Sequence, residues 1–286
     1  MKIALLTCEK LADLLPSDQL LIPELAKQGV FAKAEIWDDE SVNWLEYDYL
    51  IFRNTWDYFE KEVKFNKWLS KIEKLGIPTL NSIAIIQENK HKFYLREMEN
   101  KGFKIIPTIF IDKTANLNLL SLIPHDWQMA VIKPAFSGGA YQTLVFKHEE
   151  TDEINNKYKS IASEKDLLLQ KFMPEINTIG ETSFIFFDKI FSHCVIKKPA
   201  AGDFRVQVQF GGNYAAVIPE IIALETAQQI VDQFSGDLLY ARVDGIIING
   251  ELHLMEVECI EPDLYFTFGE GSLQRFVSSI LQLINN

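Results

Sequence analysis

The chain is constrained most by an acidic strand pattern near its C-terminus, residues 252–266, which read LHLMEVECIEPDLYF. Side chains on a strand alternate between its two faces, so Glu256 and Glu258 point the same way. The opposite face is expected to be core and carries Met255, Val257 and Cys259. Burying two neighbouring carboxylates costs roughly several kcal/mol each unless a counter-charge is present. A divalent cation supplies that charge, and Mg²⁺ favours one or two carboxylates together with substrate phosphates.

A third acid comes from the preceding strand pattern, residues 240–248 (YARVDGIII), which ends at Asn249-Gly250, a strong hairpin signal. A two-residue loop would place Asp244 opposite Met255, whereas a three-residue loop places Asp244 opposite Glu256. Like charges directly across a strand pair repel, so a metal ion would explain such a cluster. We predict the three-residue register, or a bulge with the same effect. The alternative is three exposed acids on a half-solvated sheet.

Composition narrows the class of protein. The 286 residues carry a formal net charge of −12, and no run of lysine and arginine is interleaved with aromatic residues, which argues against a nucleic-acid partner. The three cysteines lie in apolar runs and are expected to be reduced, as in a cytoplasmic protein. The N-terminal run MKIALLTC is too short for a signal peptide, and no apolar run approaches the ~20 residues that cross a membrane.

Residues 1–80 alternate strand and helix patterns, which predicts a parallel sheet. Ligands bind beyond the carboxyl ends of such strands, and Arg53 and Asp57 come at the end of one of them. We therefore predict that both contact substrate. The alternative is a salt bridge within the loop, with Trp56 as a packing anchor. No Gly-rich dinucleotide fingerprint follows the first strand pattern, so this is not an ordinary NAD site.

Residues 129–146 read as strand, Ser-Gly-Gly-Ala loop and strand. A Gly-rich hairpin lets backbone N–H groups approach phosphate oxygens closely. Lys133 is the one charge in the first apolar strand, and a buried ammonium requires an anion. The pair indicates a phosphate site. The alternative is a solvent-facing lysine beside an ordinary turn.

Seven strings stand in a specific order along the chain: TCEKLAD, FRNTWDY, NKHKFYL, VIKPAFSGGA, GETSFIFF, GDFRVQ followed by FGG, and MEVECIEPDLYF. In this order they resemble the ATP-grasp superfamily, and most of all the ligase family of D-cycloserine biosynthesis and its glutathione-synthetase-like relatives. The resemblance covers most of the chain. It implies an α/β (α+β) ATP-grasp fold, with a Rossmann-like pre-ATP-grasp domain at 1–80, an ATP-grasp domain at 81–286 and a smaller lid lobe at about 105–172.

The resemblance also implies a nucleotide site. Its expected residues are Lys92 (or Lys90) on a helix predicted over residues 82–101 and Lys133 for the phosphates, Ser137, Gly138, Gly139 and Ala140 as a flexible loop over the triphosphate, Gln170, Lys171, Phe172 and Met173 as the adenine-reading hinge, and Glu181 (or Glu175) for the ribose.

The remaining roles that the resemblance implies concern chemistry. Arg205 matches the arginine that steadies the transferring phosphoryl group, with Lys133 as its catalytic companion. The expected metal ligands are Asp244, Glu256 and Glu258. Many relatives carry Asn where this chain has Glu258, and the change keeps oxygen ligation. The expected substrate contacts are Arg53, Asp57 and Glu261.

The implied activity is an ATP-dependent carboxylate–amine or intramolecular ligase with Mg²⁺ or Mn²⁺, which acts on a small amino-acid-like substrate through an acyl phosphate. The alternatives are a nucleotide-binding regulator and a kinase that stops at the phosphorylated carboxylate. A two-carboxylate hydrolase built on Glu256 and Glu258 would leave Lys133 and the glycine loop unexplained. The sequence names no substrate, and it leaves monomer or homodimer open.

Overall fold

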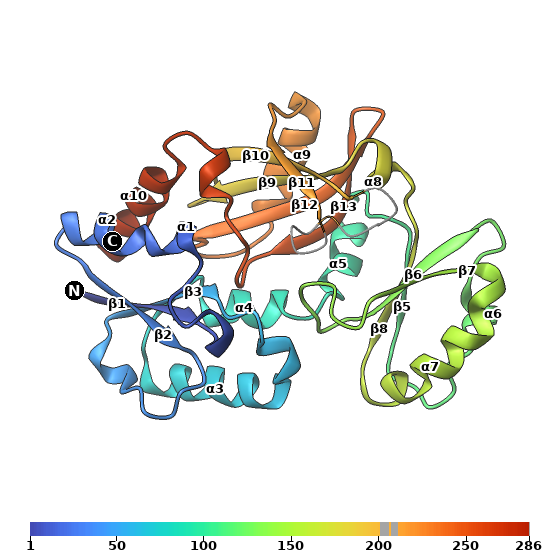
Figure 1. Ribbon diagram of the computed structural model, residues 1–286, viewed down its shortest axis with the longest axis horizontal. Helices are drawn as coiled ribbons and strands as arrows, with labels where there is room; N and C mark the ends of the chain where they lie inside the picture. The colour runs from blue at the N-terminus through green and yellow to red at the C-terminus, as the bar shows by residue number, and fades with distance from the viewer. Residues whose placement is uncertain (201–205, 207–210, 286) are drawn as a thin grey trace.

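The computed structural model describes residues 1–200, 206 and 211–285, and these residues form three β-sheets (Figure 1). The first sheet is parallel and has the order β2-β1-β3-β4. Its strands are β1 (Lys2–Thr7), β2 (Phe31–Ile36), β3 (Tyr49–Asn54) and β4 (Thr79–Leu80).

The parallel sheet forms because β1 and β3 are apolar on both faces, which requires a cover on each side. One face packs against helix α3 (Glu62–Leu75) through Phe65 and Trp68. The other packs against α2 (Leu21–Lys27) and α10 (Ser272–Asn285). The short helix α1 (Pro16–Gln19) precedes α2, and Figure 1 shows α2, α10 and both termini on the same side of the molecule.

The second sheet is antiparallel, has the order β11-β10-β9-β12-β13 and spans the upper part of Figure 1. One face shares a core with the first sheet, since Ile185 and Phe187 cluster with Ile3 and Leu5. The other face packs against helices α5 and α9. The elements are β9 (Glu181–Phe187), β10 (Ile190–Lys198), β11 (Asn213–Ala216), β12 (Tyr240–Ile248), β13 (Glu251–Glu258), α8 (Glu175–Thr178) and α9 (Ile221–Val231).

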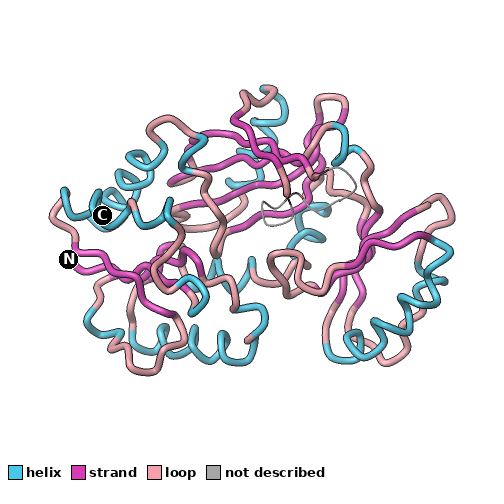
Figure 2. Tube along the Cα trace, in the orientation of Figure 1, coloured by secondary structure: helices cyan, strands magenta, loops and turns pink. Residues whose placement is uncertain are grey.

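The third sheet, at the right of Figures 1 and 2, has the order β5-β8-β6-β7 and a core of its own. That core includes Trp127 from the loop before β6 and Tyr158 from α7. The elements are β5 (Thr108–Ile111), β6 (Met129–Pro134), β7 (Leu144–Lys147), β8 (Leu167–Lys171), α6 (Leu119–Leu122) and α7 (Thr151–Glu164).

The helix predicted over residues 82–101 is in fact two helices, α4 (Ile83–Asn89) and α5 (Tyr94–Asn100). Ser82 caps α4 by accepting a hydrogen bond from the backbone N–H of Ile85. In the break, the backbone N–H of Lys92 donates to the carbonyl of Ala135, 2.9 Å away, at the end of β6. This hydrogen bond holds the backbone of Lys92 at the end of the third sheet.

Within the part of the chain that the structure describes, no helix is both long and apolar enough to span a bilayer. The division into domains at residue 80, and the extent of the lid lobe, stay predictions.

Candidate functional site

The β12–β13 hairpin brings two of the three predicted metal ligands face to face. Its loop has two residues, since Ile248 pairs with Glu251, so the predicted three-residue register is wrong. A bulge beside Asp244 has the same effect and places this residue opposite Glu256, as the alternative prediction stated. Gly245 lies at the bulge, and a Cβ there would stand 2.5 Å from the carbonyl oxygen of His253, so a larger residue would disrupt it.

The bulge also corrects the predicted face of Met255. This residue is the unpaired one on β13, and its side chain lines the same cavity as Glu256. Leu254 and Val257 remain in the core. Two consecutive side chains on one face are what an inserted strand residue produces.

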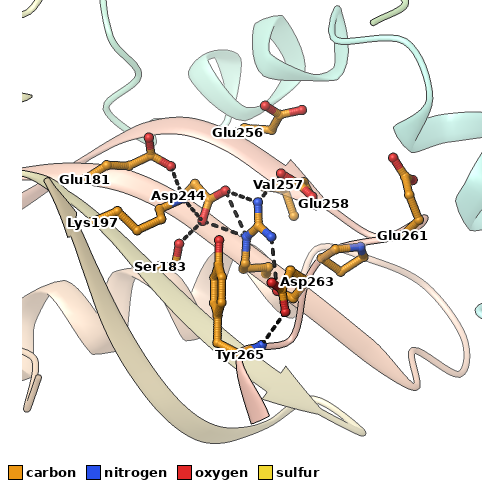
Figure 3. Close-up of polar contacts among 12 residues, drawn as sticks. Glu181, Ser183, Lys197, Asp244, Glu256, Val257, Glu258, Glu261, Asp263 and Tyr265 are labelled. Atoms are coloured by element: carbon orange, nitrogen blue, oxygen red, sulfur yellow. Dashed lines mark hydrogen bonds and ion pairs between the residues drawn. The ribbon is translucent and has the colours of Figure 1, made fainter. Parts of the chain in front are cut away.

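A cavity of about 930 Å³ is lined by residues that lie on, or next to, all three sheets. The predicted residues that line it are Lys92, Lys133, Ser137, Gly138, Gly139, Ala140, Gln170, Lys171, Phe172, Met173, Glu181, Asp244, Glu256, Glu258 and Glu261. Lys90 and Glu175, the two alternatives, do not line it. Arg205 lies outside the described residues. Figure 3 shows Glu181, Asp244, Glu256 and Glu258 on one side of the second sheet.

Alternating charges hold the carboxylates of the cavity floor in place. The guanidinium of Arg242 donates to Asp244 Oδ2 from Nη2 at 2.8 Å and from Nε at 3.0 Å, and it also donates to Glu258. Lys197 donates to Glu181 and lies 3.6 Å from Asp244 Oδ1. Since Arg242, Lys197 and Asp244 are all buried, these pairs are formed out of water and have fixed geometry.

The two acids that share Arg242 differ in their proton affinity. Burial alone would raise the pKa of Asp244, but the charges of Arg242 and Lys197 lower it to about 2. For Glu258, burial together with the charges of Glu256 and Asp244 outweighs Arg242 and raises the pKa to about 7. A further cation near Glu258 would therefore stabilise its ionised form.

Lys92 connects the acidic strand to the glycine loop. Its Nζ lies 2.7 Å from Glu256 Oε1 and also donates to the carbonyl of Ser137. By contrast, the Nζ of Lys90 bonds Asn66 and Gln87 away from the cavity. Lys92, rather than Lys90, therefore contacts both the glycine loop and an acid of β13 inside the cavity.

The loop at residues 137–140 lies against Phe59, which follows strand β3 of the first sheet. A Cβ on Gly138 would stand 2.8 Å from the ring of Phe59, so only glycine permits this approach. Gly139 and Ala140 have left-handed φ angles of 55° and 62°. The ring of Tyr141, next in the chain, packs 5.4 Å from that of Phe59. The loop therefore closes one side of the cavity.

Lys133 faces the cavity, and no described residue supplies a counter-ion for it. No ion pair joins it to any residue the structure describes, and burial lowers its pKa, opposed mainly by the charge of Glu256. An uncompensated ammonium of this kind favours an anionic ligand. The same cavity has an apolar wall, formed by Ile106, Val131, Phe172, Met173, Ile176, Val206 and Met255, the last five of which pack in one cluster.

The oxygen donors of the cavity are of the kind that magnesium prefers. Among the described residues, no three His, Cys, Asp or Glu side chains are close enough to hold a metal by themselves. Mg²⁺ is rarely held in an all-protein cage and usually takes one or two carboxylates plus phosphate oxygens. Six carboxylates and five basic side chains line the cavity, so a triphosphate there needs additional positive charge. Hard oxygen donors, together with the negative charge that a triphosphate would add, fit Mg²⁺, and the three named ligands stay a prediction.

Arg53 and Asp57 do not line the cavity, contrary to the predicted substrate contacts. Arg53 is fully buried, and its Nε donates to Asp18 Oδ1 at 2.8 Å. Asp57 accepts from Trp37 Nε1 at 2.7 Å and pairs with Lys61. Both charges are satisfied inside the protein, which corresponds to the salt-bridge alternative, except that Asp18 arrives from α1.

Sequence reasoning missed Arg242, Lys197 and Tyr265, all of which line the cavity. The signal for Arg242 was present, since it stands two residues before Asp244 on one apolar strand and therefore shares its face. Lys197 gave no comparable signal, because its partners lie on other strands.

Comparisons with known proteins agree with this geometry. Residues 3–81 match the family model described as the N-terminal domain of the D-cycloserine synthetase DcsG. The cycloserine biosynthesis protein DcsG of Streptomyces lavendulae is 22% identical over 272 residues, 89% of each chain. The crystal structure of D-cycloserine synthetase DcsG superposes with a TM-score of 0.86, at 20% identity over 99% of both chains.

A second solved structure identifies the fold. It is the ATP-grasp ligase PsnB complexed with a minimal precursor, Mg and ADP, which superposes with a TM-score of 0.62, at 12% identity over 98% of this chain and 97% of that one. The chain has the ATP-grasp fold. The resemblance inferred from the sequence strings is confirmed, both for ATP-grasp proteins and for the D-cycloserine ligase among them. These likenesses support an ATP-dependent ligase enzyme.

Proposed function

We propose that this ATP-grasp protein is an ATP-dependent carboxylate–amine or intramolecular ligase that acts on a small amino-acid-like substrate with Mg²⁺. One observation carries the proposal. A single cavity is lined by Lys133 of β6, which pairs with no described residue, by a glycine loop and by the carboxylates of β12 and β13. A hydrolase needs only the carboxylates, whereas a triphosphate uses all three.

In this proposal the nucleotide lies along the third sheet. The apolar wall around Phe172 and Met173 receives the adenine, and Glu181 lies where the ribose hydroxyls follow. Lys133 and Lys92 bind phosphate oxygens, while the loop at residues 137–140 covers them and excludes water. That exclusion matters because an acyl phosphate hydrolyses readily.

Asp244, Glu256 and Glu258 would hold Mg²⁺, which would supply positive charge against the phosphates. The role of Arg242 is to keep Asp244 ionised and oriented through its hydrogen bonds. Lys92 and Lys133 offset charge on the transferring phosphoryl group as the substrate carboxylate attacks it. Arg205 remains the proposed arginine at that group.

In this proposal the substrate binds at the end of the cavity next to the first sheet, where Trp56, Glu261 and Asp263 line it. Glu261 has no hydrogen bond or ion pair from its carboxylate to any described residue. Burial and the charge of Glu258 raise its pKa well above the ordinary value. A cationic group would relieve this, so the proposed substrate carries an ammonium group.

The test measures ADP release with Mg-ATP across a panel of D- and L-amino acids and dipeptides, each matched with its N-acetyl derivative. We expect release with free-amine members and not with the acetylated ones. Product mass should equal that of the substrates less one water. A product heavier by one phosphoryl group would instead identify a kinase, and ATP binding with no panel-dependent release would identify a regulator.

A further inference from the structure

The segment that follows β13, residues 259–265, is held in an unusual way. This segment, the strap, runs without helix or strand structure between β13 and the turn at Phe266–Phe268. Its carbonyls bond few backbone N–H groups, the contact from Phe268 to Tyr265 being one of them. An irregular buried segment must satisfy its polar groups by other means.

Side chains from elsewhere provide those hydrogen bonds, one carbonyl after another. Five consecutive carbonyls each accept from a different donor: Cys259 from Asn81 Nδ2 (2.8 Å), Ile260 from Tyr240 Oη (2.7 Å), Glu261 from Trp56 Nε1 (2.9 Å), Pro262 from Arg53 Nη2 (3.0 Å) and Asp263 from Arg242 Nη1 (3.1 Å). His193 Nε2 lies 3.1 Å from the next carbonyl, that of Leu264.

The donors belong to separate parts of the fold. Arg53 is on β3 and Trp56 follows that strand, whereas Tyr240 and Arg242 are on β12. The strap is therefore fixed from the first sheet and the second sheet together. This also accounts for Arg53, whose guanidinium donates to Asp18 and to the carbonyl of Pro262 and does not line the cavity.

Trp56 differs from the other four donors. Asn81, Tyr240 and Arg53 are fully buried and Arg242 nearly so, whereas 36% of Trp56 is exposed; like Arg242, Trp56 lines the cavity. Its indole N–H forms one hydrogen bond, to the carbonyl of Glu261. The carboxylate of Glu261 lacks a partner among the described residues, so its place in the cavity depends on how its backbone is held.

We propose that Trp56 is a positioning residue for the substrate: its indole N–H holds the backbone of Glu261 and thereby sets where the Glu261 carboxylate meets the substrate. This inference rests on the proposed function. The indole of Trp56 makes no hydrogen bond to any described residue on the nucleotide side of the cavity, which is formed by the third sheet, the loop at residues 137–140, Lys92 and the acids of β9, β12 and β13. Loss of the hydrogen bond should therefore affect the amino-acid site and spare the ATP site.

The test compares Trp56→Phe, which keeps an aromatic ring and removes the donor, with Trp68→Phe. The indole nitrogen of Trp68 is buried and has no hydrogen-bond partner among the described residues, so its replacement removes a similar volume and no hydrogen bond. For each variant we would measure amide hydrogen exchange of the strap, the KM for Mg-ATP, and the KM for an equimolar mixture of D-amino acids in the ADP-release assay.

In Trp56→Phe we expect faster strap exchange and a KM for the amino-acid mixture raised about fivefold, the effect of one net hydrogen bond. The KM for ATP should stay within about twofold, because none of its proposed contacts changes. Trp68→Phe should leave the strap exchange and both KM values near those of the unsubstituted protein.

Unchanged strap exchange in Trp56→Phe, an equal loss of ATP affinity, or the same effects in Trp68→Phe would overturn the inference. If the mixture releases no ADP in the unsubstituted protein, strap exchange and ATP affinity decide alone. Failure of the proposed function would appear separately, as an absence of Mg-ATP binding in the unsubstituted protein.

Discussion

Replacing Glu256 with alanine is expected to reduce turnover by about a hundredfold or more while the protein remains folded. Glu256 lies opposite Asp244 and contacts Lys92, so the change removes a proposed metal ligand and the anion that orients a proposed phosphate-binding lysine. Removing one preorganised electrostatic contact to a transition state typically costs about 10²–10³ in kcat. Single-turnover ADP formation measures the effect, and circular dichroism checks the fold.

A control on the same strand separates chemistry from strand stability. Glu251→Ala removes an exposed carboxylate whose partner, Lys104, is also exposed, so turnover should stay within about twofold. The variant Glu256→Gln keeps the size of the side chain and should lose nearly as much turnover as the alanine variant. Unchanged turnover in Glu256→Ala would move the metal site elsewhere.

Replacing Lys133 with alanine is expected to weaken Mg-ATP binding by about 10- to 100-fold, the usual range for a hydrogen bond to a charged group. The ammonium has no ion-pair partner among the described residues, and burial lowers its pKa. Its removal should therefore leave the ligand-free protein no less stable. Calorimetric titration with a non-hydrolysable ATP analogue measures the first effect, and thermal unfolding without ligand measures the second.

The matched control for Lys133→Ala is Lys147→Ala on β7, the neighbouring strand of the same sheet. Lys147 is exposed and pairs loosely with Glu149 at 3.9 Å, so nucleotide affinity should not change. Equal affinity in Lys133→Ala and the unsubstituted protein, or a loss of stability without a loss of affinity, would contradict a phosphate-binding role.

Local rules located the acids of this site well, because strand alternation is a short-range property. It predicted that Glu256 and Glu258 share a face, and the Asn-Gly signal predicted the hairpin that carries Asp244 on the neighbouring strand. The register was achieved through a bulge that only Gly245 admits, rather than through a longer loop. That choice depends on the close approach of a neighbouring carbonyl, which strand patterns do not show.

The substrate contacts were harder to predict, because they depend on partners far apart in the chain. Arg53 at a strand end looked available, yet Asp18 and the carbonyl of Pro262 occupy its guanidinium. Lys92 was assigned to the middle of a helix, whereas it lies in a helix break anchored to Ala135. In both cases a long-range hydrogen bond, rather than local propensity, decides what the side chain can reach.

The most direct test of the account is calorimetric titration of the purified protein with ATP, once with Mg²⁺ and once with a chelator in place of the metal. Most basic side chains of the cavity are matched by carboxylates, so a bare triphosphate would add uncompensated negative charge to its floor. We predict measurable binding with Mg²⁺ or Mn²⁺ and none with the chelator. Equal affinity in the two titrations would contradict the assignment of the β12 and β13 acids to a metal-bound triphosphate.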